Sequence, residues 1–325
     1  APAFMARNRA HPGLTGKSAG AGPFRIASWE QGARVVLKRN PNYWDPSAQH
    51  LDEITYHVLD GSKLDDILRR LASGKLDVAM ISGDGAIQAA LKARRFSVYR
   101  RTLDQFGATL GFNRTIAPLG DPVVRLALAQ AIDRRAIARG LGGTDGDVAE
   151  QLFQGSRWRC SDAGYPAFDP DGARNILAAL EVDFSRTVLW TEDTPTLRRT
   201  AQMIQAMWAK AGISIGVHVV TGQDRSLTYQ IVTGRAALWI QPKGPFVHPS
   251  ISDLALHSAS SQNITRLRSH KIDTAIARLR RARTEKDIRA AHCGFERVKT
   301  EVLPYLPVKR GVIGLITRND IGGVA

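Results

Sequence analysis

Cysteine is scarce in this chain, which has only Cys160 and Cys293 among its 325 residues. Two cysteines exclude a disulfide-rich scaffold, and the lack of Cys and His clusters excludes a zinc finger or zinc ribbon. No run of about 18 apolar residues occurs, so we expect no membrane-spanning helix. Residues 1–17 mix Pro, Gly, His and Arg and do not form the apolar core of a secretory signal. A removed signal, an omitted segment and residence in the cytosol therefore all stay open.

Motifs of nucleotide and zinc chemistry are missing as well. No Gly-x-x-x-x-Gly-Lys-Ser/Thr string occurs, and the segment Gly20-Ala21-Gly22 lacks the third glycine of a dinucleotide loop. None of the eight His residues forms a His-x-x-x-His pair with a Glu, as a zinc protease requires. We therefore expect a protein that is not an enzyme and needs no metal and no cofactor.

Basic residues exceed acidic ones by 45 to 30, a formal charge of +15, and the basic residues are 34 Arg and 11 Lys. Arginine binds phosphates, carboxylates and aromatic faces well, so such a chain could bind nucleic acid or an acidic surface. The arginines are scattered along the whole chain, however, and the densest run, Arg266–Arg289, carries apolar residues at helical spacing. This pattern favours solvated surfaces and a helix with one buried face.

Strands and helices alternate along the chain, which predicts the α/β class. Phe24–Trp29 and Arg34–Arg39 are typical of a β-hairpin, and Lys75–Ile81 is typical of a buried strand in a βαβ-like unit. The spacing of apolar residues predicts one helix over Pro122–Leu141, and Leu306–Thr317 is expected to form a pair of strands.

The two cysteines leave two alternatives open. Both fall in the part of the chain that is expected to form its second lobe. Two separate buried thiols are the favoured interpretation, and a disulfide is the alternative if the protein is exported.

Several strings, taken in order, resemble one known family. They begin with a Gly-x-Gly-Pro signature and continue along nearly the whole chain: Gly20–Arg25, Trp29, Leu37–Trp44, Leu71–Asp77, Phe112-Asn113, Asp121, Ala131–Arg134, Phe168–Pro170 and Ala211–Ile213, and more loosely Trp239, Pro249 and Ile272-Asp273. Their order and spacing resemble the family 5 solute-binding proteins of ABC transporters, the oligopeptide, dipeptide and nickel-binding group.

The resemblance implies a two-lobed, periplasmic-binding-protein type II-like α/β fold with a hinged cleft. In the family the Gly-x-Gly-Pro signature lies well inside the chain, whereas here it begins at residue 20. The expectation is therefore that the amino-terminal part of lobe I is missing. The implied division is partial lobe I at 1–115, lobe II at 116–305 and a return to lobe I at 306–325, with crossovers near 110–118 and 305–311.

The resemblance also implies where the ligand binds. Trp239 ends a strand before a Pro- and Gly-rich segment and could stack on a ligand, or it could belong to the core. Gln241, Lys243 and His248 are candidate polar lining residues in the same segment. Arg235 precedes the strand and is either a partner for an acidic ligand group or a solvated side chain.

Asn113 lies at the first expected crossover. Its side chain is either a hydrogen-bonding group of the cleft or hinge, or a turn residue that satisfies backbone groups. Peptide-binding members carry an Asp shortly after the Trp, which pairs with the free ammonium group of the ligand. Here Pro242 stands at that position, and no acidic residue occurs before Asp253. Capture of peptides through a free amine is therefore not expected.

The sequence accordingly predicts the solute-binding component of an ABC importer, located outside the cytoplasm as a periplasmic protein or cell-surface lipoprotein. Its expected partners are a small peptide or other polar extended solute and a membrane permease. We expect a monomer and no nucleic acid. The alternatives are a cytoplasmic ligand-sensing or nucleic-acid-associated module on the same fold, or a remnant without a tight ligand.

Overall fold

The computed structural model describes residues 20–61, 63–221, 224–244, 248–249 and 254–322. Its internal contacts divide the chain into two compact units, one ending at Arg69 and one beginning at Arg70. Each unit has a β-sheet of its own, and the two sheets share no strand. The units are therefore described separately.

The first unit is a three-stranded antiparallel sheet in the order β1-β2-β3, formed by β1 (Phe24–Glu30), β2 (Arg34–Arg39) and β3 (Glu53–His57). The predicted hairpin is confirmed, because Glu30 pairs with Arg34 across a tight turn. Gly32 has a φ of +75° in this turn, a value that favours glycine. Helix α2 (Leu64–Ala72) follows and spans the boundary between the units.

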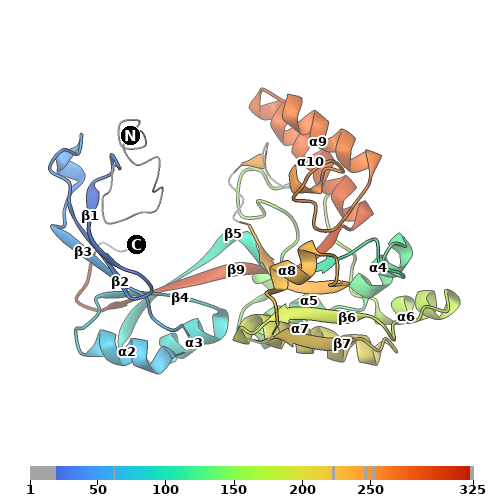
Figure 1. Ribbon diagram of the computed structural model, residues 1–325, viewed down its shortest axis with the longest axis horizontal. Helices are drawn as coiled ribbons and strands as arrows, with labels where there is room; N and C mark the ends of the chain where they lie inside the picture. Colours follow the sequence, from blue (N-terminus) through green and yellow to red (C-terminus); the bar gives the residue numbers. More distant parts are fainter. Residues whose placement is uncertain (1–19, 62, 222–223, 245–247, 250–253, 323–325) are drawn as a thin grey trace. The chain divides into compact units, whose positions relative to one another are not determined.

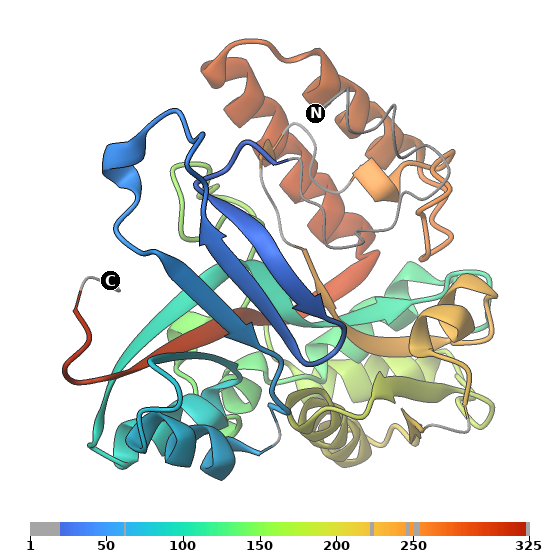
Figure 2. The same ribbon diagram turned by 60° about the vertical axis from the view of Figure 1, so that its left-hand side comes forward.

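The second unit contains a six-stranded sheet in the order β4-β9-β5-β8-β6-β7. Its strands are β4 (Val78–Ser82), β5 (Phe96–Phe112), β6 (Val188–Glu192), β7 (Gly216–Val220), β8 (Leu238–Lys243) and β9 (Tyr305–Arg318). β6 is parallel to β7 and β8, and the other pairs are antiparallel. Figure 1 shows the long strands β5 and β9 lying side by side, and Figure 2 shows the same pair from another direction.

Two strand predictions are wrong. The βαβ-like unit does not form, because β3 and β4 belong to different sheets and β4 pairs antiparallel with β9. Leu306–Thr317 is not a pair of strands but most of one 14-residue strand, β9. In both cases the sequence shows extended segments but not their pairing partners, which lie far away along the chain.

The described helices of the second unit connect and cover these strands. They are α3 (Asp84–Lys92), α4 (Pro122–Gln130), α5 (Arg134–Gly140), α6 (Pro170–Ala179), α7 (Pro195–Lys210), α8 (Leu227–Val232), α9 (His270–Arg281) and α10 (Glu285–Val302), with short 3-10 turns at Asp145–Asp147 and Leu254–Leu256.

The single helix predicted over residues 122–141 is wrong, because the segment forms two helices, α4 and α5. Asp121 caps α4 by accepting a hydrogen bond from the backbone N–H of Val123. Asp133 caps α5 by accepting one from the N–H of Ala136 at 2.8 Å. An Asp side chain that binds a nearby N–H favours a new helix start over an uninterrupted helix, which explains the break.

Two of the apolar cores in the described part of the second unit pack its sheet against its helices. The larger one joins strands β5, β6 and β8 to helices α4, α6 and α7, and Trp208 at its centre donates a hydrogen bond to the carbonyl of Leu128 at 3.0 Å. The smaller one packs α9 and α10 against residues 149–158 and against Phe106 and Tyr305. The strands β5 and β9 therefore contribute side chains to both cores.

Cys160 and Cys293 form a disulfide, so the favoured interpretation as two separate thiols is wrong. The bond joins the long connection after α5 to helix α10. Gln151 holds the backbone of Cys160 in place. The amide nitrogen of Gln151 donates a hydrogen bond to the carbonyl of Cys160, and the amide oxygen of Gln151 accepts one from the N–H of Cys160. A sequence separation of 133 residues hides this proximity from sequence patterns.

The pairing of β5 with β9 is irregular in its middle. Its register shifts three times between Thr102 and Thr109. A Cβ added at Gly107 would lie 2.9 Å from the carbonyl oxygen of Arg310, and one at Gly311 would lie 2.8 Å from the side chain of Gln105. Glycine is thus required where the two strands approach each other closely. This region overlaps the predicted second crossover, and movement about it stays a prediction.

Candidate functional site

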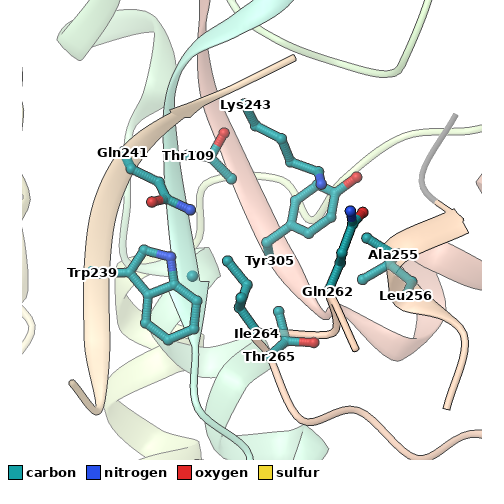
Figure 3. Close-up of a pocket in the computed structure, with 11 residues that line it drawn as sticks. Thr109, Trp239, Gln241, Lys243, Ala255, Leu256, Gln262, Ile264, Thr265 and Tyr305 are labelled. Atoms are coloured by element: carbon teal, nitrogen blue, oxygen red, sulfur yellow. The ribbon is translucent and has the colours of Figure 1, made fainter. Parts of the chain in front are cut away.

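A pocket lies on one face of three neighbouring strands, β8, β5 and β9. Trp239 pairs with Gly111, which pairs in turn with Tyr305, so these three residues form one row across the sheet. Gln241 pairs with Thr109 in the next row. Because side chains alternate between faces along a strand, Trp239, Gln241 and Lys243 share one face of β8. Figure 3 shows their side chains around the pocket.

The pocket floor depends on the absence of a side chain at Gly111. A Cβ there would lie 2.1 Å from Cε2 of Trp239, so the indole lies directly against the glycine backbone. On its other side Trp239 packs with Leu227 and Ile231 of α8. Trp239 is only 2% exposed and yet lines the pocket, so the two alternatives for this residue, core and cavity lining, both describe it.

The opposite wall comes from the segment that leads to α9. Its lining residues are Ala255, Leu256, Gln262, Ile264 and Thr265. The cavity has a volume of about 60 Å³, several times the roughly 10–15 Å³ that one water molecule needs. That volume suits one functional group of a ligand and is much smaller than a peptide.

Three polar groups on the strand face are available for a ligand. Thr109 is 4% exposed, and its Oγ1 has no hydrogen-bond partner among the described residues. The side chains of Trp239 and Gln241, with the indole Nε1 and an amide, also line the pocket. An unsatisfied buried hydroxyl costs free energy, so the Thr109 hydroxyl is available to a ligand group or a water molecule that enters the pocket.

Positive charge lies beside the pocket. The Nζ of Lys243 lies 5.0 Å from the ring centroid of Tyr305, and the Nζ of Lys299 lies 5.6 Å from the same ring. Lys299 is fully buried and forms an ion pair with Glu296 at 2.6 Å. The carboxylate of Glu296 compensates the charge of Lys299.

The pocket brings together Trp239, Gln241 and Lys243 but not the other three predicted residues. Asn113 follows β5 directly and is 1% exposed. Its Oδ1 accepts hydrogen bonds from the N–H and the hydroxyl of Thr115, and its Nδ2 donates to the carbonyl of Gly234 at 3.2 Å. These bonds match the alternative of a turn residue, and a ligand contact at Asn113 stays a prediction.

His248 and Arg235 also lie outside the pocket lining. The ring of His248 packs edge-on against Trp158, with centroids 5.2 Å apart. Arg235 is exposed, and its guanidinium lies 5.7 Å from the ring centroid of Tyr229. A ligand role for these two residues is untested.

Sequence reasoning missed Thr109, Gly111 and Tyr305. One signal for the first two was present, because apolar Ala108, Leu110 and Phe112 alternate with Gly107, Thr109 and Gly111 along β5. This period of two marks a second face without large apolar side chains. No comparable signal existed for Tyr305, which reaches the site only through the pairing of β9 with β5.

A buried ionic cluster lies beside the irregular stretch of β5 and β9. Asp84 at the start of α3 contacts Arg100 at 2.8 Å and Lys309 at 2.5 Å, and Arg100 also contacts Asp147 at 2.6 Å. Burial alone would raise the pKa of Asp147, but hydrogen bonds from Arg100 and Thr144 outweigh it and hold that pKa below its ordinary value. The cluster joins α3, β5, β9 and the Asp145–Asp147 turn by buried ion pairs.

In the part of the chain that the structure describes, no group of three or more His, Cys, Asp or Glu side chains could hold a metal ion. Among the described helices, none has both the length and the apolar character to cross a bilayer.

Comparison with known proteins identifies the family. The model of the bacterial extracellular solute-binding proteins, family 5, middle region, matches residues 5–255. The chain therefore belongs to this family of bacterial binding proteins.

Individual relatives agree with this result. A dipeptide-binding protein of Pseudomonas aeruginosa is 27% identical to this chain over 207 residues. The matched region covers 61% of this chain and 38% of that protein. The probable ABC transporter periplasmic-binding protein SapA of Escherichia coli is 23% identical to this chain over 319 residues. That matched region covers 94% of this chain and 57% of SapA. The chain thus spans only about two fifths to three fifths of the length of these relatives.

Solved structures share the fold. NikZ from Campylobacter jejuni, in complex with Ni(L-His), superposes with a TM-score of 0.80 at 18% identity, over 96% of this chain and 65% of NikZ. DppA from Helicobacter pylori, in complex with the peptide STSA, has a TM-score of 0.76 at 18% identity, over 99% of this chain and 63% of DppA. The predicted α/β fold of the periplasmic-binding-protein type II class is confirmed.

Proposed function

We propose that this chain forms part of the solute-binding component of an ABC importer. The observation that carries the proposal is the family match over residues 5–255, a range that includes strands β5 and β8 of the pocket. Relatives of the chain are binding proteins, and the pocket offers hydrogen-bonding groups and an aromatic floor. Such a site binds a solute without making or breaking covalent bonds.

The proposed ligand is a peptide or another polar extended solute. Related proteins are named for dipeptides or were solved with a peptide or a nickel–histidine complex. Because the cavity has room for one functional group, we infer that it binds one end or one side chain of a longer ligand. The remaining contacts would come from the second lobe as the lobes close about the crossover strands.

The proposed setting is outside the cytoplasm, with a membrane permease as the partner and a monomeric binding protein. The disulfide between Cys160 and Cys293 supports this setting, because disulfides persist in the periplasm and on cell surfaces and are rare in the cytosol.

Binding measurements test the proposal. Purified protein is titrated with pools of di- and tripeptides by isothermal calorimetry and thermal shift, and co-purified solutes are identified by native mass spectrometry. Trp239→Ala should weaken binding by about 1–3 kcal/mol, because it removes the aromatic floor, while unfolding stays cooperative. Trp239→Phe keeps the ring and should lose less.

Trp44→Ala is the matched control, because this side chain is 80% exposed and should leave affinity unchanged. Equal affinities for Trp239→Ala and Trp44→Ala would remove Trp239 from the binding site. A folded protein that binds no peptide pool and carries no co-purified solute would contradict the proposed function and favour the remnant without a tight ligand.

A further inference from the structure

Helices α9 and α10 carry a large share of the positive charge of the chain. The two helices follow each other in sequence and lie side by side in the second unit (Figure 1). Residues 266–302 contain eleven Lys and Arg against five Asp and Glu, a surplus of six, whereas the whole chain of 325 residues has a surplus of fifteen. Two fifths of the net charge therefore lie in about a ninth of the sequence.

Almost all of this charge reaches the surface. Lys299 is the one buried cation of residues 266–302, all of which the structure describes, and it is paired with the buried Glu296. The other ten Lys and Arg are exposed, against four acidic side chains that are exposed or half-buried. The apolar residues Ile272 and Ile276 of α9 are buried in the smaller core. The outward surface of residues 266–302, here called the α9–α10 face, is therefore basic.

A groove of about 380 Å³ runs between the two helices. This volume is in the range of about 300–1,000 Å³ that is usual for ligand sites. Lys271 and Arg278 of α9 and Arg297 of α10 line the groove. Lys271 forms an ion pair with Glu301, and Arg297 forms one with Asp162, but all four of these side chains are more than half exposed. Exposed pairs contribute little to stability, so both cations can exchange their partners for a stronger anion.

The α9–α10 face has no apolar anchor for a protein partner. Stable protein–protein interfaces are centred on aromatic and other large side chains that become buried in the contact. Within residues 266–302, which are described throughout, no large apolar side chain is exposed. A charged surface without such anchors suits a fluid anionic surface, whose charges can rearrange to match those of the protein.

We propose that the α9–α10 face docks on an anionic phospholipid surface and that a headgroup phosphate enters the groove. The proposal rests on the proposed function in one respect, the setting outside the cytoplasm, which the disulfide of Cys160 and Cys293 supports. In that setting the extended anionic surface is a membrane and not nucleic acid. Each Lys or Arg near an anionic membrane strengthens binding about fivefold. Such docking holds the solute-binding component close to the permease.

The test measures binding of the full chain to lipid vesicles by co-sedimentation. Vesicles of phosphatidylcholine alone are compared with vesicles that contain about one third phosphatidylglycerol, at about 50 and 500 mM salt. We expect binding to the anionic vesicles to be at least about tenfold tighter than to the neutral ones at the lower salt concentration. At the higher concentration the difference should largely disappear, because salt screens exposed charges.

A triple variant assigns this binding to the groove. Lys271→Gln/Arg278→Gln/Arg297→Gln removes three cations that line it, and this variant should bind the anionic vesicles at least about tenfold more weakly. Denaturant titration checks that the variant still unfolds cooperatively.

The matched control removes the same charge elsewhere in the second unit. Arg186→Gln/Arg199→Gln/Lys210→Gln replaces three exposed cations, one before β6 and two on α7. Because screening limits each charge to its surroundings, this variant should lose less than about threefold in vesicle binding. Equal losses in the two triple variants would show that net charge alone acts and would overturn the assignment to the α9–α10 face.

Two other outcomes would overturn the inference, and one would support it alone. A preparation that binds peptide but not anionic vesicles would overturn it and leave the proposed function intact. Duplex DNA binding that the groove variant abolishes and the control variant keeps, without vesicle binding, would assign the face to nucleic acid instead. A folded protein that binds anionic vesicles through the groove but binds no solute would support this inference and contradict the proposed function.

Discussion

Gly111 is the residue on which the pocket floor depends. Gly111→Ala would place a Cβ 2.1 Å from the Trp239 indole, so the ring must move. Overpacking of this kind typically costs about 1–3 kcal/mol, and we expect that loss in the free energy of unfolding, measured by denaturant titration. Gly216→Ala is the matched control at the start of β7, where nothing lies within 4 Å of the added atom. Equal stabilities of the two variants would contradict the described indole position.

Asp147 provides a pH prediction. Its pKa is lowered in the folded state, so its stabilising contribution is fully present above its ordinary value of 3.8 and is lost as pH falls through the lowered pKa. Asp147→Asn should therefore reduce the free energy of unfolding at pH 7 by about 1–3 kcal/mol. The difference from the unsubstituted protein should shrink as pH falls from about 4 to 2.

The matched control for this pH prediction is Asp145→Asn. Asp145 forms an ion pair with Arg139 at which both side chains are more than half exposed. Such pairs contribute about 0–1 kcal/mol, so this variant should stay close to the unsubstituted protein at every pH. A gap between Asp147→Asn and the unsubstituted protein that is constant from pH 7 to pH 2 would contradict the assigned role of the carboxylate.

At the residue scale, three of the predicted residues line the candidate pocket, and their contacts with a ligand stay a prediction. The sequence predicted Gln241 and Lys243 in a segment after the strand, but β8 extends to Lys243, so both share one face with Trp239. Thr109 and Tyr305 come from strands that reach β8 only by long-range pairing, and a single sequence contains no information on that register.

At the scale of elements, the disulfide fastens the connection after α5 to helix α10. It closes a loop of 133 residues, for which chain-entropy arguments and measured cases give about 2–5 kcal/mol. The double variant Cys160→Ser/Cys293→Ser should lose that amount in denaturant unfolding. Reducing agent should destabilise the unsubstituted protein in the same way and leave the variant unchanged. An unsubstituted protein whose stability is indifferent to reductant would contradict a stabilising role for the bond.

Elements with local signals were predicted well, and elements set by distant partners were not. The β1–β2 hairpin was predicted because its turn and both strands lie within one short segment. The division of residues 122–141 into α4 and α5 was missed because Asp133 fits an exposed position of one helix as readily as the cap of a second. The middle of β9 contains Gly311 and Gly314, a composition that is also typical of a turn between two strands, but here both glycines allow close packing.

At the scale of the whole molecule, the excess of arginine serves the interior in part. Arg125 is fully buried and donates to the carbonyls of Leu119, Gly120, Val302 and Leu303, which joins the start of α4 to the end of α10. Burial lowers the pKa of its guanidinium to about 10, so it stays charged at neutral pH. A basic composition therefore does not by itself indicate a surface for nucleic acid, and the expectation of no nucleic-acid partner stays a prediction.

Salt dependence separates the solute-binding function from the nucleic-acid alternative. A chain of charge +15 can associate with duplex DNA at low salt, but each neutralised phosphate adds about −0.9 to the slope of log affinity against log salt concentration. A di- or tripeptide presents few charges, so peptide affinity should change less than about tenfold between 50 and 500 mM salt. Fluorescence anisotropy with a labelled duplex and calorimetry with a di- or tripeptide that binds, run on the same preparation, measure both. Tight duplex binding that persists at 200 mM salt, together with no peptide binding, would favour the nucleic-acid-associated module instead.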